Sequence, residues 1–372
     1  MLKSVTRRLR EPGIRGHEAG AGWLFLLPVI VILGLFLVLP IAMAVWVSFS
    51  DWNGNGSPLG THAHWVGLQN YRHLLTTPGL DQNNFGESLR NNFYYVILVV
   101  PVQTAVALLL AVFVNRRVKF VGFFRTAFYF PSVTSSVAIT ILFLFLFSPS
   151  GVINKLLSYL GATGPSWMYD PRGLFHVILG QFGVTNPPSS LANGLFLGVS
   201  YWDWVSGPSI AMCVFILMAV FTTSGTFMLL FLAALQNIDE SVNEAAALDG
   251  ATEWRKFRHV TVPMIRPTIF TVVTLGLIGT WQIFDQIYTG TQGSPSNTTL
   301  TPAFLSFNTS FNGNEWGVGA ALAFILFAII VFFTVVTRLA TRNPDRLSRR
   351  RRFLPTTTVQ SGQSRVATGG SR

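Results

Sequence analysis

Long, almost uncharged runs of apolar residues dominate this chain. Six of them are prominent, at residues 23–49, 93–114, 123–147, 210–235, 268–289 and 317–339. An α-helix rises about 1.5 Å per residue, so about 20 residues are enough to cross the hydrocarbon layer of a bilayer. Each run is long enough for one crossing. The pattern therefore predicts an all-α integral membrane protein with about six transmembrane helices.

Polar segments between these runs divide the chain into three parts. A basic tail (1–22) comes first, a transmembrane domain (23–340) follows, and a second basic tail (341–372) ends the chain. The first tail is expected to be mobile and the second disordered, because neither has enough apolar residues to form a core. The connecting segments of the transmembrane domain are outer loops at 50–92, 148–209 and 290–316, a tight inner turn at 116–122 and an inner loop at 237–267.

The outer loop 148–209 contains two apolar stretches, 174–184 and 191–205. Both are too short to cross a bilayer, and Gly and Pro interrupt them. We therefore expect an interfacial or folded outer cap rather than further crossings. Tyr201, Trp202 and Trp204 are predicted to lie at the depth of the lipid headgroups, where amphipathic rings are favoured.

The charge of the chain supports this topology. Hydrophobic residues make up 50% of the sequence, charged residues only 11%, and the net charge is +11. With six crossings, 22 of the 26 Lys and Arg residues fall on the side that carries both termini. The positive-inside rule then predicts cytoplasmic N- and C-termini. The basic residues are topology signals first, some of them could also contact anionic membrane lipid, and we predict no nucleic-acid partner.

The inner loop 237–267 has the strongest local signals. Ser241 and Glu244 have the spacing of a capping box, which predicts a short helix from about Val242. Gly250 follows the alanine-rich helix at the place where a residue with positive φ is needed. A second short helix is expected from Glu253.

Aromatic and branched residues mark the second helix of this loop. Trp254, Phe257 and Val260 share one face of it, and Pro263 and Pro267 are expected to end it before the fifth crossing. Read physically, the loop is a helix–turn–helix outside the membrane. Its alanines would let the first helix insert into a groove of another protein, or the loop simply connects two crossings.

The same loop resembles the EAA motif of permeases from binding-protein-dependent ABC importers. Glu-Ala-Ala at 244–246 is followed by Gly250, by Val260 after nine residues, and by Val-Pro at 262–263. Two valines replace the Ile and Leu of the usual pattern. The resemblance implies the architecture of a type I importer permease, placed in a bacterial plasma membrane.

In that family this helix is the coupling helix, which docks into a cytoplasmic ATPase. By resemblance, Glu244 makes a polar or ionic contact, Ala245 and Ala246 seat against the ATPase, and Asp249 helps to hold the turn set by Gly250. The implied partners are an ATPase dimer that binds ATP and Mg, a second homologous permease and an extracytoplasmic solute-binding protein. The chain has no Gly-x-x-x-x-Gly-Lys-Ser/Thr loop, so no cofactor is expected in it and it is not expected to be an enzyme.

Over residues 20–340 the chain is most similar to the carbohydrate-uptake permeases of that family. The segments 91–93, 130–132 and 281–299 carry this part of the resemblance. The polar and aromatic residues of the fifth crossing are candidates for the solute path, because sugars are bound by planar polar groups and aromatic faces. They are Trp281, Gln282, Phe284, Asp285 and Tyr288. Thr222, Thr223, Ser224 and Thr226 of the fourth crossing either line the same path or pack between helices.

Three alternative functions stay open at this point. The chain could import a solute other than a sugar. A self-sufficient secondary transporter would show intramembrane charge chains or repeated halves, and only Asp285 fits that description. A membrane enzyme would need clustered His, Asp or Glu, so neither a catalytic nor a metal site is predicted.

Overall fold

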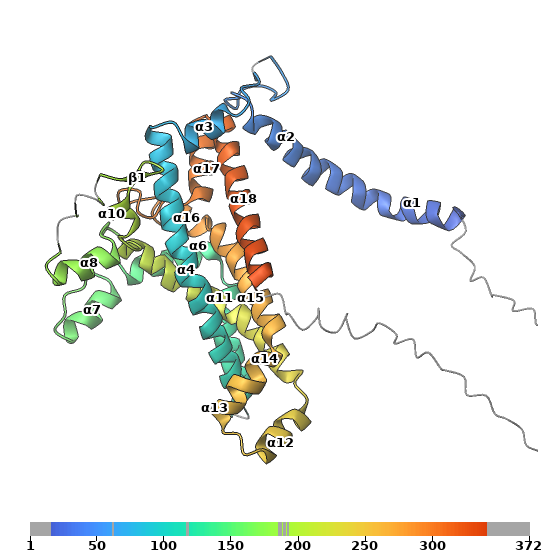
Figure 1. The fold of residues 1–372 in the computed structure, drawn as a ribbon, viewed down its shortest axis with the longest axis vertical. Helices are drawn as coiled ribbons and strands as arrows, with labels where there is room; N and C mark the ends of the chain where they lie inside the picture. Colours follow the sequence, from blue (N-terminus) through green and yellow to red (C-terminus); the bar gives the residue numbers. More distant parts are fainter. Residues whose placement is uncertain are drawn as a thin grey trace, which may run out of the picture.

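The computed structural model describes residues 16–340, except 62, 117, 118, 185–187, 189, 190 and 192. The described residues form a helical bundle with a lateral extension on its outer half (Figure 1). The tail 341–372 lies outside the described residues, as does most of the tail 1–22. Residues 16–22 are an exception, because α1 already begins at Gly16 and not near Trp23.

Five helices of the described chain are long and apolar enough to cross a membrane. They are 21–48 (the helical run α1 Gly16–Leu33, η1 Gly34–Val38 and α2 Leu39–Ser48), α4 Leu80–Asn115, α11 Ile210–Gln236, 266–290 (α15 Arg266–Trp281 and α16 Asp285–Gly290) and α18 Trp316–Ala340. A bent pair, α5 Val121–Val133 and α6 Ser136–Leu146, raises the number to six if it is one crossing. The prediction of an all-α membrane protein with about six crossings is confirmed.

The third predicted crossing, 123–147, is not one straight helix. Its two halves, α5 and α6, meet at an angle of 97°. Thr134 and Ser135 between them have extended backbone, with ψ of 145° and 132°. Pro131 lacks an amide hydrogen, and the hydroxyl of Thr134 donates to the carbonyl of Phe130 at 3.0 Å, so local groups compete with regular helix pairing here.

Helix α4 begins at Leu80, well before the predicted start of the second crossing at 93. Its polar outer turns are held by side-chain hydrogen bonds to distant segments. Asn91 Nδ2 donates to the carbonyls of Asn297 and Leu300 at 2.7 and 3.0 Å, and Asn92 Nδ2 donates to the carbonyl of Trp281 at 3.1 Å. The outer loop 50–92 thus contains the start of α4 and a further helix, α3 Gln69–Leu75.

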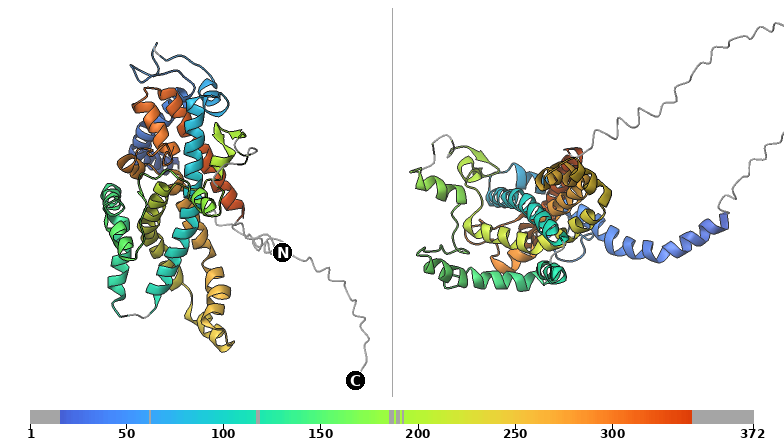
Figure 2. Two further views of the ribbon diagram at one scale, coloured as in Figure 1. Left: turned by 90° about the vertical axis from the view of Figure 1, so that its left-hand side faces the viewer. Right: turned by 90° about the horizontal axis from the view of Figure 1, so that it is seen from below.

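The outer segment 148–209 is folded, as expected, and no helix of its described residues is long enough to cross a membrane. It contains α7 Val152–Tyr159, α8 Leu174–Gln181, a β-hairpin (β1 Leu195–Phe196 and β2 Val199–Ser200) and α10 Tyr201–Trp204. Leu195 pairs with Ser200 and Phe196 with Val199 in antiparallel register. The headgroup depth of Tyr201, Trp202 and Trp204 stays a prediction. These elements form the lateral extension of Figures 1 and 2.

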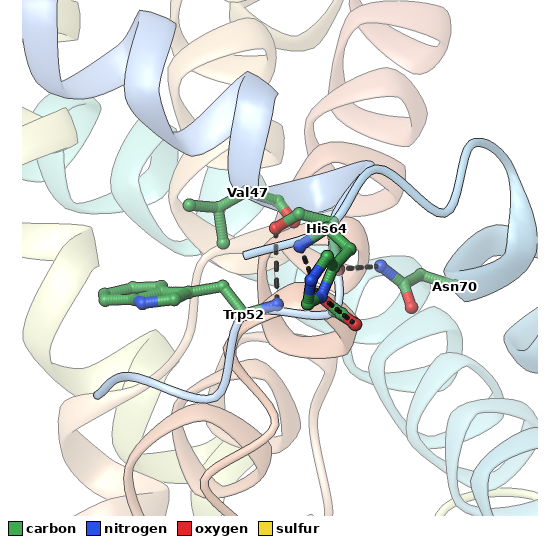
Figure 3. A network of polar contacts seen from close by, with 6 residues as sticks. Val47, Trp52, His64 and Asn70 are labelled. Carbon is green, nitrogen blue, oxygen red and sulfur yellow. Dashed lines mark hydrogen bonds and ion pairs between the residues drawn. The ribbon is translucent and has the colours of Figure 1, made fainter. Parts of the chain in front are cut away.

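The first helix projects from the bundle and has no buried residue along its apolar window (Figures 1 and 2). Polar contacts fasten its outer end (Figure 3). Ser50 Oγ donates to the carbonyl of Val47 at 2.9 Å, and Asn70 Nδ2 donates to the carbonyl of Ser50 at 2.8 Å. Asp51 accepts a hydrogen bond from the backbone amide of His64 at 2.6 Å. These hydrogen bonds join the end of α2 to the segment that leads into α3.

Helices α4 and α11 pack along each other in the centre of the bundle, and α5 covers a further side of α11. Gly225 of α11 makes the approach of α5 possible. A Cβ atom on Gly225 would lie 2.3 Å from the carbonyl oxygen of Phe128 and 3.1 Å from Cα of Tyr129. Small residues at helix crossings allow this closeness in membranes, where van der Waals packing drives association.

We expect Gly225→Ala to destabilise the folded chain by about 1–3 kcal/mol, because backbone atoms of α5 must move aside. Thermal unfolding of the detergent-solubilised protein, followed by gel filtration, measures this change. Gly122→Ala in α5 is the matched control, since a Cβ atom there meets nothing within 4 Å. An equal melting temperature for the two variants would contradict the packing argument.

Candidate functional site

The inner loop 237–267 lies at the end of the bundle opposite α3, where α12 Glu240–Leu248 projects (Figure 1). Its N-cap is Asp239, not Ser241. The Asp239 carboxylate accepts a hydrogen bond from the backbone amide of Ser241 at 2.9 Å, and this bond lowers the pKa of Asp239. The predicted capping box of Ser241 and Glu244 is therefore wrong, and the helix begins at Glu240 rather than near Val242. Asp and Ser are comparable N-caps, and the Asp239 carboxylate also meets the positive end of the helix dipole.

The end of α12 agrees with the prediction. Gly250 has a φ of +70°. Its amide donates to the carbonyl of Ala247 at 3.0 Å, and the amide of Ala251 donates to the carbonyl of Ala246 at 3.0 Å. These two bonds form a Schellman motif, which satisfies carbonyls that the helix leaves unpaired. Both ends of α12 are thus fixed by local hydrogen bonds rather than by packing.

The exposed face of α12 differs in one position from the predicted docking face. Glu244, Ala245 and Asp249 are exposed, but Ala246 is only 9% exposed. Leu248 is 90% exposed, four residues after Glu244 on the same helix. Sequence reasoning missed Leu248, although an apolar residue at i+4 from a polar docking residue was a usable signal. The face offers the carboxylates of Glu244 and Asp249, the small side chain of Ala245 and the large apolar side chain of Leu248.

The second half of the loop is helical but irregular. It runs through α13 Glu253–Lys256, the π-helical η2 Phe257–Thr261 and α14 Val262–Met264. The helical run ends at Met264, the turn at Ile265 lies between Pro263 and Pro267, and α15 begins at Arg266 with Pro267 in its first turn. The predicted end of this helix before the fifth crossing is thus confirmed, although Pro263 itself is still part of the helical run. Trp254 and Phe257 stack with ring centroids 5.8 Å apart, so the predicted shared face is present for this pair.

A polar hollow lies inside the bundle where the fifth crossing is broken. Between α15 and α16, the residues 282–284 leave the helical path. A cavity of about 270 Å³ there is bordered by α4, α11 and the break itself. A second cavity of about 300 Å³ lies at the bend between α5 and α6. The two cavities share four lining residues, namely Thr222, Thr223, Phe227 and Gln286.

Three of the five predicted solute-path residues line the first cavity, namely Gln282, Phe284 and Asp285. Trp281 does not, because it is 1% exposed and stacks on Phe333 of α18 with centroids 5.5 Å apart. Tyr288 does not line it either, and its ring stacks on Phe284 at 5.5 Å. Trp281 thus acts in the structure as a core residue, and Tyr288 as part of an aromatic group on α16 and α17 Pro302–Phe311.

The threonines of α11 had two possible roles, and the structure separates them. Thr222 and Thr223 line both cavities and Thr226 lines the second, while Ser224 is buried. The hydroxyls of Thr222 and Thr223 also bond to carbonyls of their own helix. The three threonines therefore contribute to the wall of the hollow, and Ser224 to packing.

Gln103 is the residue that sequence reasoning missed. It lies near the middle of the apolar run 93–114, it is 0% exposed to solvent outside the protein, and it lines the first cavity. Its Oε1 accepts a hydrogen bond from the hydroxyl of Thr223 at 2.6 Å, while its Nε2 has no partner among the described residues. A single amide within an apolar run was the available signal, since polar groups in membrane helices usually face a cavity or a partner.

The hollow brings together hydroxyls, amides, one carboxylate and the three aromatic rings of Tyr95, Phe227 and Phe284 at the level of the membrane helices. Side-chain amides and carboxylates present paired donors and acceptors in a plane, which suits vicinal hydroxyl groups. No group of three or more His, Cys, Asp or Glu in the described part of the chain is placed to hold a metal ion. The arrangement is suited to transient binding of an uncharged, hydroxyl-rich solute.

Comparison with known proteins gives consistent matches. The family described as "Binding-protein-dependent transport system inner membrane component" matches residues 103–349. The lactose transport system permease protein LacF of Rhizobium radiobacter is 31% identical over 293 residues, which are 78% of this chain and 83% of LacF. The trehalose/maltose transport system permease protein MalF of Thermococcus litoralis is 26% identical, over 87% of this chain and 94% of MalF.

A solved structure of a bacterial ABC transporter that imports the acidic polysaccharide alginate has a similar fold. The TM-score is 0.66 at 19% identity, and the match covers 88% of this chain and 96% of the other. A structure of the alginate transporter in complex with its pentasaccharide-bound periplasmic protein matches with a TM-score of 0.65. At this identity the likeness concerns the fold alone.

Proposed function

Because the chain belongs to the family of binding-protein-dependent transport system inner membrane components, which are multi-pass membrane proteins, we propose that it forms half of the translocation pathway of an ATP-driven sugar importer. Members of this family are the permease component and are not themselves catalytic. The single observation that carries the proposal is the loop 237–267. Its helix α12 is fixed at both ends and presents Glu244, Ala245 and Leu248 outward.

This exposed helix is the proposed docking point for a cytoplasmic ATPase. Leu248 supplies apolar area, Glu244 supplies charge, and Ala245 allows close approach of the two surfaces. The ATPase dimer would bind ATP and Mg, and its closure would move α12 together with the crossings on either side of it. In the proposed topology the loop and both termini lie in the cytoplasm, in agreement with the distribution of Lys and Arg.

The proposed pathway also needs an extracytoplasmic binding protein and a second permease that supplies the other wall. The family description includes dependence on a binding protein, and the alginate transporter that shares this fold was solved with a periplasmic protein bound to it. The hollow at Gln282, Phe284 and Asp285 is the proposed solute contact of this half. Relatives named for lactose and for trehalose/maltose support a sugar, and the hollow's chemistry agrees with one.

Reconstitution tests the proposal. The chain is co-expressed with its neighbouring permease and ATPase genes, purified, and placed in liposomes with the binding protein and a panel of labelled mono- and oligosaccharides. We expect uptake of at least one sugar that requires ATP and every partner. Uptake by the chain alone would instead support a self-sufficient transporter. ATP-dependent uptake of a non-sugar solute alone would support the permease function but contradict the proposal that the solute is a sugar.

A further inference from the structure

A third cavity, of about 470 Å³, lies between the inner ends of the crossings and the loop 237–267. Its floor is apolar and comes from two crossings, with Leu109 and Val112 of α4 and Leu235 at the end of α11. Trp254 and Phe257 close it from the loop side. Leu109 is 65% exposed, so the cavity is open beside the apolar run of α4. This inner pocket is separate from the solute hollow and from the outward face of α12.

Three charged residues line the inner pocket, namely Arg116, Glu253 and Lys256. The Lys256 side chain is only 24% exposed, whereas that of Glu253, its carboxylate partner, is 87% exposed and 3.9 Å away. The cation is thus held inside the pocket and the anion points mainly to water, so Glu253 compensates Lys256 weakly. Arg116 adds a second positive charge at the inner end of α4. The pocket therefore has apolar walls below and cations at its cytoplasmic rim.

From this geometry we propose that the inner pocket binds a phospholipid with an anionic headgroup. The acyl chains enter past Leu109 and lie on the apolar floor, and the phosphate is placed between Arg116 and Lys256. Basic pockets between membrane helices on the cytoplasmic side are suited to anionic headgroups, and an indole ring such as that of Trp254 is favoured at headgroup depth. Free phosphate is disfavoured because it leaves the apolar floor exposed to water.

The bound lipid lies between the crossings and the loop 237–267 and contacts both. Because α4, α11 and the loop all contribute to the walls, the pocket must change shape whenever the loop moves relative to the crossings. A lipid that prefers one shape of the pocket shifts the balance between those states by its difference in affinity. The composition of the inner leaflet thereby regulates how the loop moves.

Quenching of Trp254 fluorescence tests this proposal on the full chain in nanodiscs. The discs contain phosphatidylcholine plus a small fraction of either brominated phosphatidylglycerol or brominated phosphatidylcholine. Trp254 emission is obtained by subtracting the spectrum of the Trp254→Phe variant. We expect half-quenching at about tenfold less brominated phosphatidylglycerol than brominated phosphatidylcholine, from two cations near the headgroup. Soluble glycerol phosphate is expected not to reverse the quenching.

The double variant Arg116→Gln/Lys256→Gln is expected to lose this preference. Arg258→Gln is the matched control, because Arg258 is an exposed cation of the same loop outside the pocket, and it should keep the preference. Mass spectrometry of phospholipids retained after delipidation gives a second measurement that does not depend on fluorescence. Equal quenching by both lipids, a preference that survives in the double variant, or release of quenching by soluble glycerol phosphate would overturn the proposal. So would full recovery of Trp254 emission when the ATPase is added, since a protein partner would then occupy the pocket.

Discussion

Replacement of Gly250 by proline is expected to reduce sugar uptake by about a hundredfold while the protein stays in the membrane. Proline holds φ near −65°, whereas Gly250 requires +70°. The substitution also removes the amide that donates to Ala247, and it disfavours the helical conformation of Asp249 before it. A cost of about 3 kcal/mol at this turn corresponds to about a hundredfold loss of the docked conformation.

The measurement is ATP-driven uptake in proteoliposomes, together with the amount of ATPase that co-purifies with the chain. Gly250→Asn is the matched control, because asparagine tolerates positive φ and keeps the amide donor, and we expect its uptake to stay within about threefold of the original. A second control is Gly161→Pro, which alters a turn of φ +76° in the outer segment. Equal uptake by Gly250→Pro and Gly250→Asn would show that the Schellman motif does not shape the docking helix.

The second large effect is expected for Gln103→Leu. Leucine has a similar size and needs no hydrogen bond, so the amount of folded chain should not fall. The unpaired Nε2 of Gln103 is the fully buried donor of the hollow, and its loss should weaken solute binding by about 1–3 kcal/mol. We expect an increase of about tenfold or more in the solute concentration that gives half-maximal uptake, with ATPase activity in the absence of solute unchanged.

Thr104→Val is the control for this experiment. Thr104 is adjacent in α4, but its hydroxyl donates to the carbonyl of Val100 at 2.7 Å and it does not line the hollow. Thr223→Val is expected to give a smaller effect, because it removes a hydroxyl of the wall that orients Gln103 but leaves the Gln103 amide in place. If Gln103→Leu lowers the maximal rate and the amount of protein together, without a change in half-saturation, Gln103 is a structural residue and not a solute contact.

The number and position of the crossings could be predicted from the sequence, because burial in lipid requires apolar runs of a defined length. The turn at Gly250 could likewise be predicted from the sequence, since few residues other than glycine adopt positive φ. Both features depend on chemistry that is local to a short segment. The short helix before Gly250 could be predicted for the same reason, since its alanines favour helix locally.

The bend between α5 and α6 and the exact N-cap residue of α12 could not be predicted from the sequence in this way. The 97° angle between α5 and α6 lies where Pro131 and the hydroxyl of Thr134 compete with regular helix pairing, and these residues do not by themselves predict the size of the bend. Asp239 and Ser241 are both good caps, and their competition is decided by a backbone conformation that the sequence does not show. Trp281 had the composition of a sugar-binding residue, yet contact with Phe333 makes it part of the core. Gln103 is close to the solute hollow only because α4, α11 and α15 meet there.

The length of α4 has a mechanical consequence. At 36 residues it is the longest helix of the described chain and spans about 54 Å. Asn91 near its outer end is tied to the segment that follows α16, and Val112 near its inner end forms part of the wall behind the coupling loop. A tilt of about 5° over this length displaces one end by about 5 Å relative to the other. A single helix thus reaches from the outer loops to the inner loop, so a rigid tilt of α4 would move both of its ends together, without a relay of rearranging side chains.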